Sequence, residues 1–237
     1  MTPLEQALLL SFLAGAAIPA GGLLAAVEHI HPRWLEDEFR HTVIAFGGGA
    51  LLAAVALVLV PEGVAVLSVP VAAGAFLGGG VAFMLLDRAI AKHGGTGAQF
   101  LAMLLDFVPE AMALGAAFAA GGSGGPLLAF LIGIQNLPEG FNAFREVTDG
   151  KNTGKRGMLA KFAALSLVGP ASAYIGITLF ATRPEALGVL MLVAAGGILY
   201  LTFQDIAPQA RLKRSGSPAL GAVVGFLMGM VGAMVAG

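Results

Sequence analysis

Long apolar runs alternate along the chain with short polar breaks. A helix needs roughly 20 apolar residues to cross a bilayer, and the runs have that length. The breaks carry charge, glycine and proline, as in HPRWLEDEFRH (31–41), TDGKNTGKRG (148–157) and RLKRSGSP (211–218). The pattern predicts eight membrane-spanning helices, which cover residues 5–28, 42–61, 70–90, 97–120, 126–147, 157–181, 185–207 and 217–237.

Composition agrees with this pattern. Of the 237 residues, 57% are hydrophobic and only 11% are charged, with a mean hydropathy of +0.87, whereas a soluble domain carries about 25% charge. We therefore expect an all-α integral membrane protein, a single polytopic domain over residues 1–237 whose surroundings are the lipid bilayer and not a nucleic acid. The 35 glycines favour a tightly packed bundle. Without cysteine there is neither a disulfide nor a thiolate metal site.

The basic residues orient the chain. Eight spans place both termini on one side and the four odd-numbered connections on the other. Of the 13 Lys and Arg residues, only Arg183 is nearest to the termini side, which leaves 12 with the odd connections. The positive-inside rule then predicts that these connections are cytoplasmic and that both termini lie outside, in the inner cell membrane.

Three carboxylates fall in the middle of apolar runs. Asp106 and Glu110 lie in the run 97–120, and Glu139 lies in the run 126–147. A carboxylate at the bilayer centre costs at least ~2.5–3.5 kcal/mol, so such groups face the bundle and have a partner. No Lys or Arg occupies the middle of a run. The pattern therefore favours an imported cation or protonation as the source of neutralisation.

The spacing of these residues strengthens the argument. Asp106 and Glu110 are four residues apart, as are Gln135 and Glu139, so each pair shares one helix face. A proline, Pro109 or Pro138, precedes each glutamate and frees the carbonyl four residues before it. Two kinked helices that present oxygen atoms at matched positions can enclose a divalent cation. An alternative for Gln135 and for its neighbour Asn136 is a simple hydrogen bond between helices.

Other polar residues lie closer to the membrane boundaries. We expect Gln204 and Asp205, near the inner end of their helix, to be pathway residues or merely interfacial, and Glu62 to lie at the outer mouth. Asp87 beside Arg88 is interpreted as a pair at a helix boundary. The histidines His29 and His31 are interpreted as solvated, with capture of an exiting metal as the alternative.

No enzymatic reaction is expected. The GGSG segment at 121–124 matches the G-x-S-G pattern of intramembrane serine proteases, but it falls in a connection. No histidine lies in the middle of a span to serve as its base. We interpret the segment as a flexible turn, and we expect neither catalytic nor cofactor-binding residues.

Six segments resemble the ZIP (Zrt/Irt-like) metal-ion transporters, most closely their bacterial GufA-like branch. They cover most of the chain and read AFGGGALLAAVALVLVPEG (45–63), GAFLGGGVAFMLLD (74–87), FLAMLLDFVPEAMALGAAFA (100–119), IQNLPEGFNAF (134–144), GPASAYIG (169–176) and YLTFQDIAPQAR (200–211). The resemblance implies a ZIP-like bundle of eight helices, a homodimer, and a metal site between the fourth and fifth helices. It assigns the metal to Asp106, Glu110, Gln135, Asn136 and Glu139.

The chain departs from the family pattern at several metal positions. Asp106 stands where the fourth-helix motif has histidine, and Phe107 stands where it has asparagine. Gly169 replaces a glutamate on the sixth helix, and Gln204 replaces a histidine on the seventh. The remaining donors are all oxygen atoms, which suit Mg, Mn and Ca better than zinc. We expect one cation site and weaker zinc binding than in a typical ZIP protein.

The resemblance implies inward movement of a divalent cation of the zinc, iron or manganese class, as transported substrate. The alternative is a ZIP-fold protein that binds or senses the metal without carrying it. Phe107 and Gly169 favour that alternative. The sequence leaves open the identity of the metal and of any coupling ion.

Overall fold

The computed structural model describes residues 1–27, 33–93, 96–121, 124–148, 154–180, 182–210 and 216–236. These residues form helices and turns, without a strand among them. The helices are α1 (Pro3–Val27), α2 (Arg33–Ala54), α3 (Val60–Ala65), α4 (Val69–His93), α5 (Thr96–Ala120), α6 (Gly124–Thr148), α7 (Lys155–Leu165), α8 (Val168–Phe180), α9 (Pro184–Leu201), α10 (Ala207–Gln209) and α11 (Ser217–Ala236). Two π-helical turns, η1 (Val55–Leu59) and η2 (Thr202–Ile206), complete the series.

The predicted all-helical membrane character is confirmed in its coarse form. In the described part of the chain, six helical segments are long and apolar enough to cross a membrane: Pro3–Val27, Asp37–Ala65, Val69–Ile90, Lys155–Phe180, Pro184–Gln209 and Ser217–Val235. The helices α5 and α6 are not among these six, so the count of eight spans stays a prediction. His29 and His31 lie outside the described residues.

Glycines set the closest helix contacts. In four helix pairs, each partner presents a glycine at which a Cβ atom would collide with a backbone carbonyl of the other helix. The pairs are α1–α6 (Gly21 and Gly140), α2–α11 (Gly49 and Gly225), α4–α9 (Gly79 and Gly196) and α5–α8 (Gly115 and Gly176). Small residues let membrane helices approach until their backbones touch. The predicted tight packing is therefore found at these four helix pairs, where glycines form the contacts.

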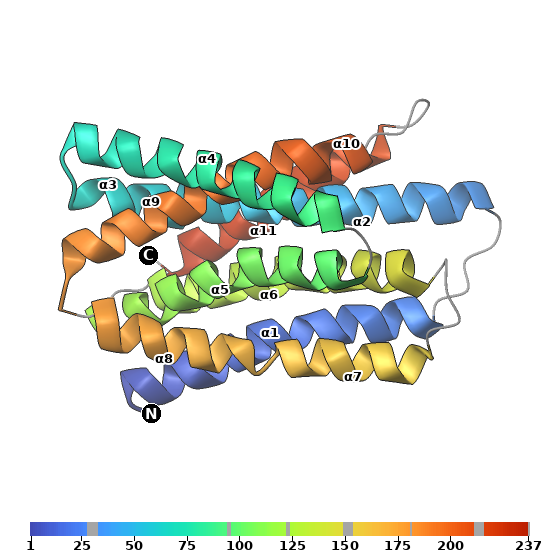
Figure 1. Ribbon diagram of the computed structural model, residues 1–237, viewed down its shortest axis with the longest axis horizontal. Coiled ribbons are helices and arrows are strands. Elements are labelled where there is room, and N and C mark those ends of the chain that lie inside the picture. Colours follow the sequence, from blue (N-terminus) through green and yellow to red (C-terminus); the bar gives the residue numbers. More distant parts are fainter. Residues whose placement is uncertain are drawn as a thin grey trace.

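These pairs sort the bundle into two halves. One half contains α1, α5, α6, α7 and α8, and the other contains α2, α3, α4, α9, α10 and α11. Figure 1 shows α1, α7 and α8 on one side of the molecule and α2, α4 and α10 on the other, with both termini toward the same end of the bundle. The most extensive contact between the halves is that of α2 with α6, so α6 lies at their boundary.

Prolines explain the two π-helical turns. Pro61 and Pro208 lack the N–H that would bond the carbonyl four residues earlier, in Leu57 and Gln204. The residue just before each proline instead donates to the carbonyl five residues back, Val60 to Val55 and Ala207 to Thr202. The wider turn η2 carries Asp205. Such π-helical turns are frequent at functional sites.

Candidate functional site

A polar stripe runs along one face of α6. Gln135, Glu139, Asn142 and Glu146 are spaced by four, three and four residues, which places all four on the same side of the helix. All four line a cavity of about 400 Å³ between the halves of the bundle. Only Gln135 and Glu139, the first half of this stripe, were predicted from the sequence.

The other walls of the cavity come from α2, α4, α5 and the end of the α9–α10 segment. Gly47 and Gly48 of α2 line it, and a Cβ atom there would lie 3.0 Å from Pro138 Cγ and 2.8 Å from Ile206 Cγ2, so the two glycines let α2 pack closely against α6 and η2. Asp87 of α4, Asp106 of α5 and Asp205 of η2 join Glu139 and Glu146, so five carboxylates face one space. No Lys or Arg of the described chain belongs to this lining. The cavity therefore has the negative charge expected of a cation-binding site, and no basic side chain of its described lining neutralises that charge.

Glu110 and Gln135 join α5 to α6 beside the cavity. The Gln135 amide Nε2 donates to Glu110 Oε2 over 2.6 Å, in a hydrogen bond that a carboxylate acceptor strengthens. Glu110 is 0% exposed and Gln135 is 2% exposed. Glu139 lines the cavity, whereas Glu110 lies outside its lining. That Glu110 and Glu139 face each other across α5 and α6 stays a prediction.

Four buried oxygen atoms in or beside the cavity have no hydrogen-bond partner in the described chain: Asp106 Oδ1, Glu110 Oε1, Gln135 Oε1 and Asn142 Oδ1. Asp106 is itself only 8% exposed. A buried polar atom without a partner carries a cost of about 1–3 kcal/mol. Because native interiors rarely tolerate such atoms, four in one region call for a ligand or a proton. The first three belong to residues that the sequence singled out.

The oxygen donors do not form a closed metal cage. Within the ranges that the structure describes, no three His, Cys, Asp or Glu side chains are grouped closely enough to hold an ion. One reason is that two of the five predicted ligands, Gln135 and Asn136, are amides. Another is that Gln135 already occupies one oxygen of Glu110. The arrangement can accept a cation through carboxylate and amide oxygens only if these side chains rearrange around it.

Asn136 contacts a different helix from its neighbour Gln135. Its amide Nδ2 donates to the backbone carbonyl of Ala14 on α1 over 3.0 Å, and the side chain is 1% exposed. It does not belong to the lining of the cavity. The hydrogen bond between helices, which the sequence left open as an alternative for this residue, is present. A ligand role for Asn136 stays a prediction.

Phe107 and Gly169 fit each other. The Phe107 ring is buried, and a Cβ atom at Gly169 would lie 2.8 Å from Phe107 Cζ and 2.6 Å from the Ser11 carbonyl oxygen. A Cβ atom at Gly15 would likewise lie 2.9 Å from Phe107 Cζ. The ring therefore packs against α1 and α8, and Phe107 does not line the polar cavity. The two departures from the ZIP pattern form one apolar contact, in which no larger residue fits at position 169.

The remaining predicted pathway residues differ in whether they line the cavity. Asp205 lines the cavity, whereas Gln204 is exposed and lies outside its lining. Glu62 lies beside Gly124, near the opposite end of α6 from Glu146, and also does not line the cavity. Roles for Gln204 and Glu62 in a pathway stay predictions.

Sequence reasoning missed Asp87, Asn142, Glu146 and Gln209 as lining residues. Asp87 was interpreted as a boundary partner of Arg88, but it accepts a hydrogen bond of 3.1 Å from the Tyr200 hydroxyl and faces the cavity. The signal for Asn142 and Glu146 was available in the spacing of the α6 stripe. Asp87 and Gln209 join the site only through packing of distant helices, which no local pattern reveals.

Neither protein-family models nor curated proteins give a match to this chain. Its function must therefore be inferred from its own residues and from the geometry of the cavity.

Proposed function

We propose that the chain is a ZIP-like transporter that moves a divalent metal cation into the cytoplasm through the boundary between α5 and α6. The single observation that carries this proposal is the trio of buried, unpartnered oxygen atoms, Asp106 Oδ1, Glu110 Oε1 and Gln135 Oε1, at the edge of an acidic cavity. A divalent cation would satisfy these oxygens and neutralise the carboxylates together. Protonation is the alternative, because it neutralises a carboxylate and gives it an O–H donor.

The position of the cavity supports an inward route. Its lining residues on α4, on α6 and on the α9–α10 segment lie from the middle to the C-terminal ends of those helices. Asp106 lies in the N-terminal half of α5, and the α2 lining residues lie near the middle of the α2–α3 segment. All these ends point the same way in the bundle (Figure 1). The described basic residues other than Arg183 are nearer to that end. By the positive-inside rule, the cavity connects the buried oxygens to the cytoplasm and the termini lie outside, in the inner membrane.

The donor chemistry sets the expected order of metals. Carboxylate and amide oxygens suit hard cations such as Mn²⁺ and Mg²⁺, and the cavity lining contains no imidazole or thiolate among the described residues. The class of substrate that we propose is zinc, iron or manganese, with manganese favoured over zinc. The homodimer that we also propose rests on the resemblance to ZIP proteins.

Uptake into proteoliposomes tests the proposal. We expect vesicles with wild-type protein to take up Mn²⁺ along an inward concentration gradient, and vesicles with Glu139→Gln to lose this uptake. Empty vesicles should take up no Mn²⁺. Glu185→Gln, which removes an exposed carboxylate at the start of α9, is the matched control and should leave uptake unchanged. Absence of uptake by well-folded wild-type protein with any of Mn²⁺, Zn²⁺ and Fe²⁺ would contradict transport.

Binding without carriage is the second candidate, a ZIP-fold protein that binds or senses metal. The observation in its favour is that Gln135 occupies one Glu110 oxygen, so a cation must displace or reorient an existing contact. Isothermal titration distinguishes the two functions. Titration that detects Mn²⁺ binding, together with proteoliposomes that show no uptake, supports the sensor.

A further inference from the structure

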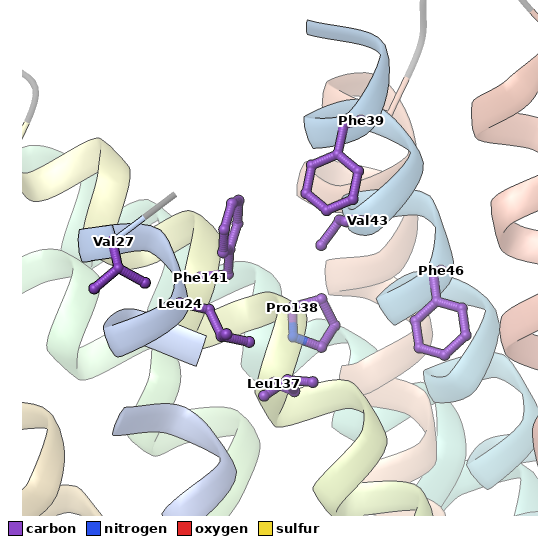
Figure 2. Close-up of a pocket in the computed structure, with 8 residues that line it drawn as sticks. All are labelled: Leu24, Val27, Phe39, Val43, Phe46, Leu137, Pro138 and Phe141. Carbon is purple, nitrogen blue, oxygen red and sulfur yellow. The ribbon is translucent and has the colours of Figure 1, made fainter. Parts of the chain in front are cut away.

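An apolar groove lies on the side of α6 that faces away from the polar stripe. It has a volume of about 370 Å³ and is lined by Leu24, Val27, Phe39, Val43, Phe46, Leu137, Pro138 and Phe141. Figure 2 shows these side chains converging from α1, α2 and α6. Every lining side chain is a hydrocarbon, so the groove offers no side-chain hydrogen bond to a polar ligand. It is a site for a hydrocarbon chain.

The groove is open to its surroundings. Leu24 is 51% exposed, Val27 is 61% exposed and Leu137 is 37% exposed. All three helices that form it are proposed to span the membrane, so the surroundings at this depth are acyl chains. Apolar packing distinguishes one lipid tail poorly from another, because lipid tails are as apolar as the side chains. Any preference for one lipid must therefore come from its headgroup.

Two cations flank the groove at one end. The Arg145 guanidinium lies 5.8 Å from the centre of the Phe141 ring, which lines the groove. The Lys155 ammonium donates to the carbonyl of Ala26, next to the lining residue Val27, over 3.3 Å. Both cations belong to the basic end of the bundle, where the proposed orientation places the anionic cytoplasmic surface of the membrane. Hydrocarbon walls with cations at one end match an anionic lipid in shape and charge.

We propose that this groove binds an acyl chain of an anionic phospholipid, whose headgroup phosphate contacts Arg145 and Lys155. Arginine suits phosphate because its planar guanidinium presents several N–H donors at once, and lysine adds a compact charge. The proposal depends on the membrane placement of α1, α2 and α6 but not on cation transport. A failure to carry metal would leave it intact.

Native mass spectrometry of the full chain in detergent, titrated with phosphatidylglycerol or phosphatidylcholine of the same acyl chains, measures the preference. We expect tighter binding of phosphatidylglycerol, with about a fivefold loss for each of Arg145→Gln and Lys155→Gln and no change for phosphatidylcholine. This loss corresponds to about 1 kcal/mol for each basic residue near an anionic surface. The matched control is Lys161→Gln, because Lys161 lies 6.0 Å from the Phe100 ring, away from the groove.

A second variant tests the hydrocarbon part of the site. Leu24→Trp fills the groove from an exposed position, so the core packing is left intact, and it should lower binding of both lipids. If that variant fails to fold, Val27→Trp makes the same test from a still more exposed position. Equal binding of the two lipids by wild-type protein, or equal losses in Lys161→Gln and Lys155→Gln, would overturn the proposal.

Discussion

The two faces of α6 meet opposite environments within one helix. Gln135, on the polar stripe, is 2% exposed and has an oxygen atom without a partner in the described chain. Leu137, only two residues later, is 37% exposed and lines the apolar groove. Pro138 lines both the groove and the polar cavity, so the two spaces meet the same residue. At this level of α6 the polar side chain faces the protein interior and a hydrocarbon side chain faces the surroundings, the reverse of a helix in water.

This contrast changes which observation signals function. In a bilayer an exposed leucine costs nothing, whereas a buried carboxylate or amide without a partner is expensive. The unpaired oxygens of the cavity therefore point to a ligand directly. Only Arg145 and Lys155 beside it suggest that the groove binds a particular lipid, because hydrocarbon surface by itself is the ordinary exterior of a membrane helix.

The largest expected effect is the difference in Mn²⁺ binding between a substitution on the polar face of α6 and one on its apolar face. Glu139→Gln should weaken Mn²⁺ binding about tenfold to a hundredfold, because a hydrogen bond or contact to a charged group is worth about 1.5–3 kcal/mol. Leu137→Ala, on the groove face two residues away, should leave Mn²⁺ binding unchanged. Isothermal titration of both variants measures the difference. A matching loss in Leu137→Ala would mean that the two faces do not act separately.

The next effect concerns the packing that holds α6 against α1. A Cβ atom at Gly21 would collide with the Leu137 carbonyl, so Gly21→Ala should lower the free energy of unfolding by about 1–3 kcal/mol through overpacking. Gly78→Ala on α4 is the matched control, since nothing lies within 4 Å of a Cβ atom there. Thermal unfolding in detergent compares them. Equal melting temperatures would show that α1 and α6 separate freely at this contact.

A smaller effect concerns metal preference within the cavity. Asp106→His should raise zinc affinity and lower manganese affinity, because an imidazole nitrogen suits zinc and the substitution removes one negative charge. We expect the ratio of the two affinities to change about tenfold, which corresponds to about 1.4 kcal/mol. The buried Phe107 ring packs toward α1 and α8, so it leaves the space beside Asp106 free for the exchange.

Competitive titration with both metals checks this crossing of preferences. Glu185→His, at an exposed position at the start of α9 that does not line the cavity, controls for zinc bound by a surface histidine. Parallel weakening of both metals in Asp106→His would mean that Asp106 is not a ligand.

Local pattern predicted the helical architecture and the buried polar residues, since both depend on spacing along one helix. The runs of apolar residues located the helices, and the matched Pro-Glu segments located Glu110 and Glu139. The π-helical turn at Asp205 was not predicted, although Pro208 was visible, because a proline in a helix can be accommodated by a kink as well as by a wider turn.

The composition of the cavity depended on contacts between distant segments. Asp87 and Asp205 reach it from α4 and η2, which meet α6 only after the two halves of the bundle assemble. Asn136 and Gln135 are adjacent and chemically alike, yet one bonds α1 and the other faces Glu110. Their difference arises from a rotation of about 100° per residue combined with the identity of the neighbouring helix. A single sequence gives the rotation between the two residues, but it does not give the identity of the neighbouring helix.

The smallest effect belongs to the outer end of the polar stripe. Glu146 is exposed at the C-terminal end of α6, where its charge attracts cations without being a tightly held ligand. Glu146→Gln should slow metal exchange through the cavity by about two- to threefold at low salt, and the difference should vanish near 1 M salt, where the screening length is about 3 Å. Rates of Mn²⁺ uptake at increasing concentrations of potassium chloride measure this dependence. Glu139→Gln, deeper on the same stripe, should keep its defect at every salt concentration, because a partly buried charge is screened much less. A salt-resistant defect in Glu146→Gln would instead assign this residue to the metal site itself, and the stripe would then be one continuous set of ligands.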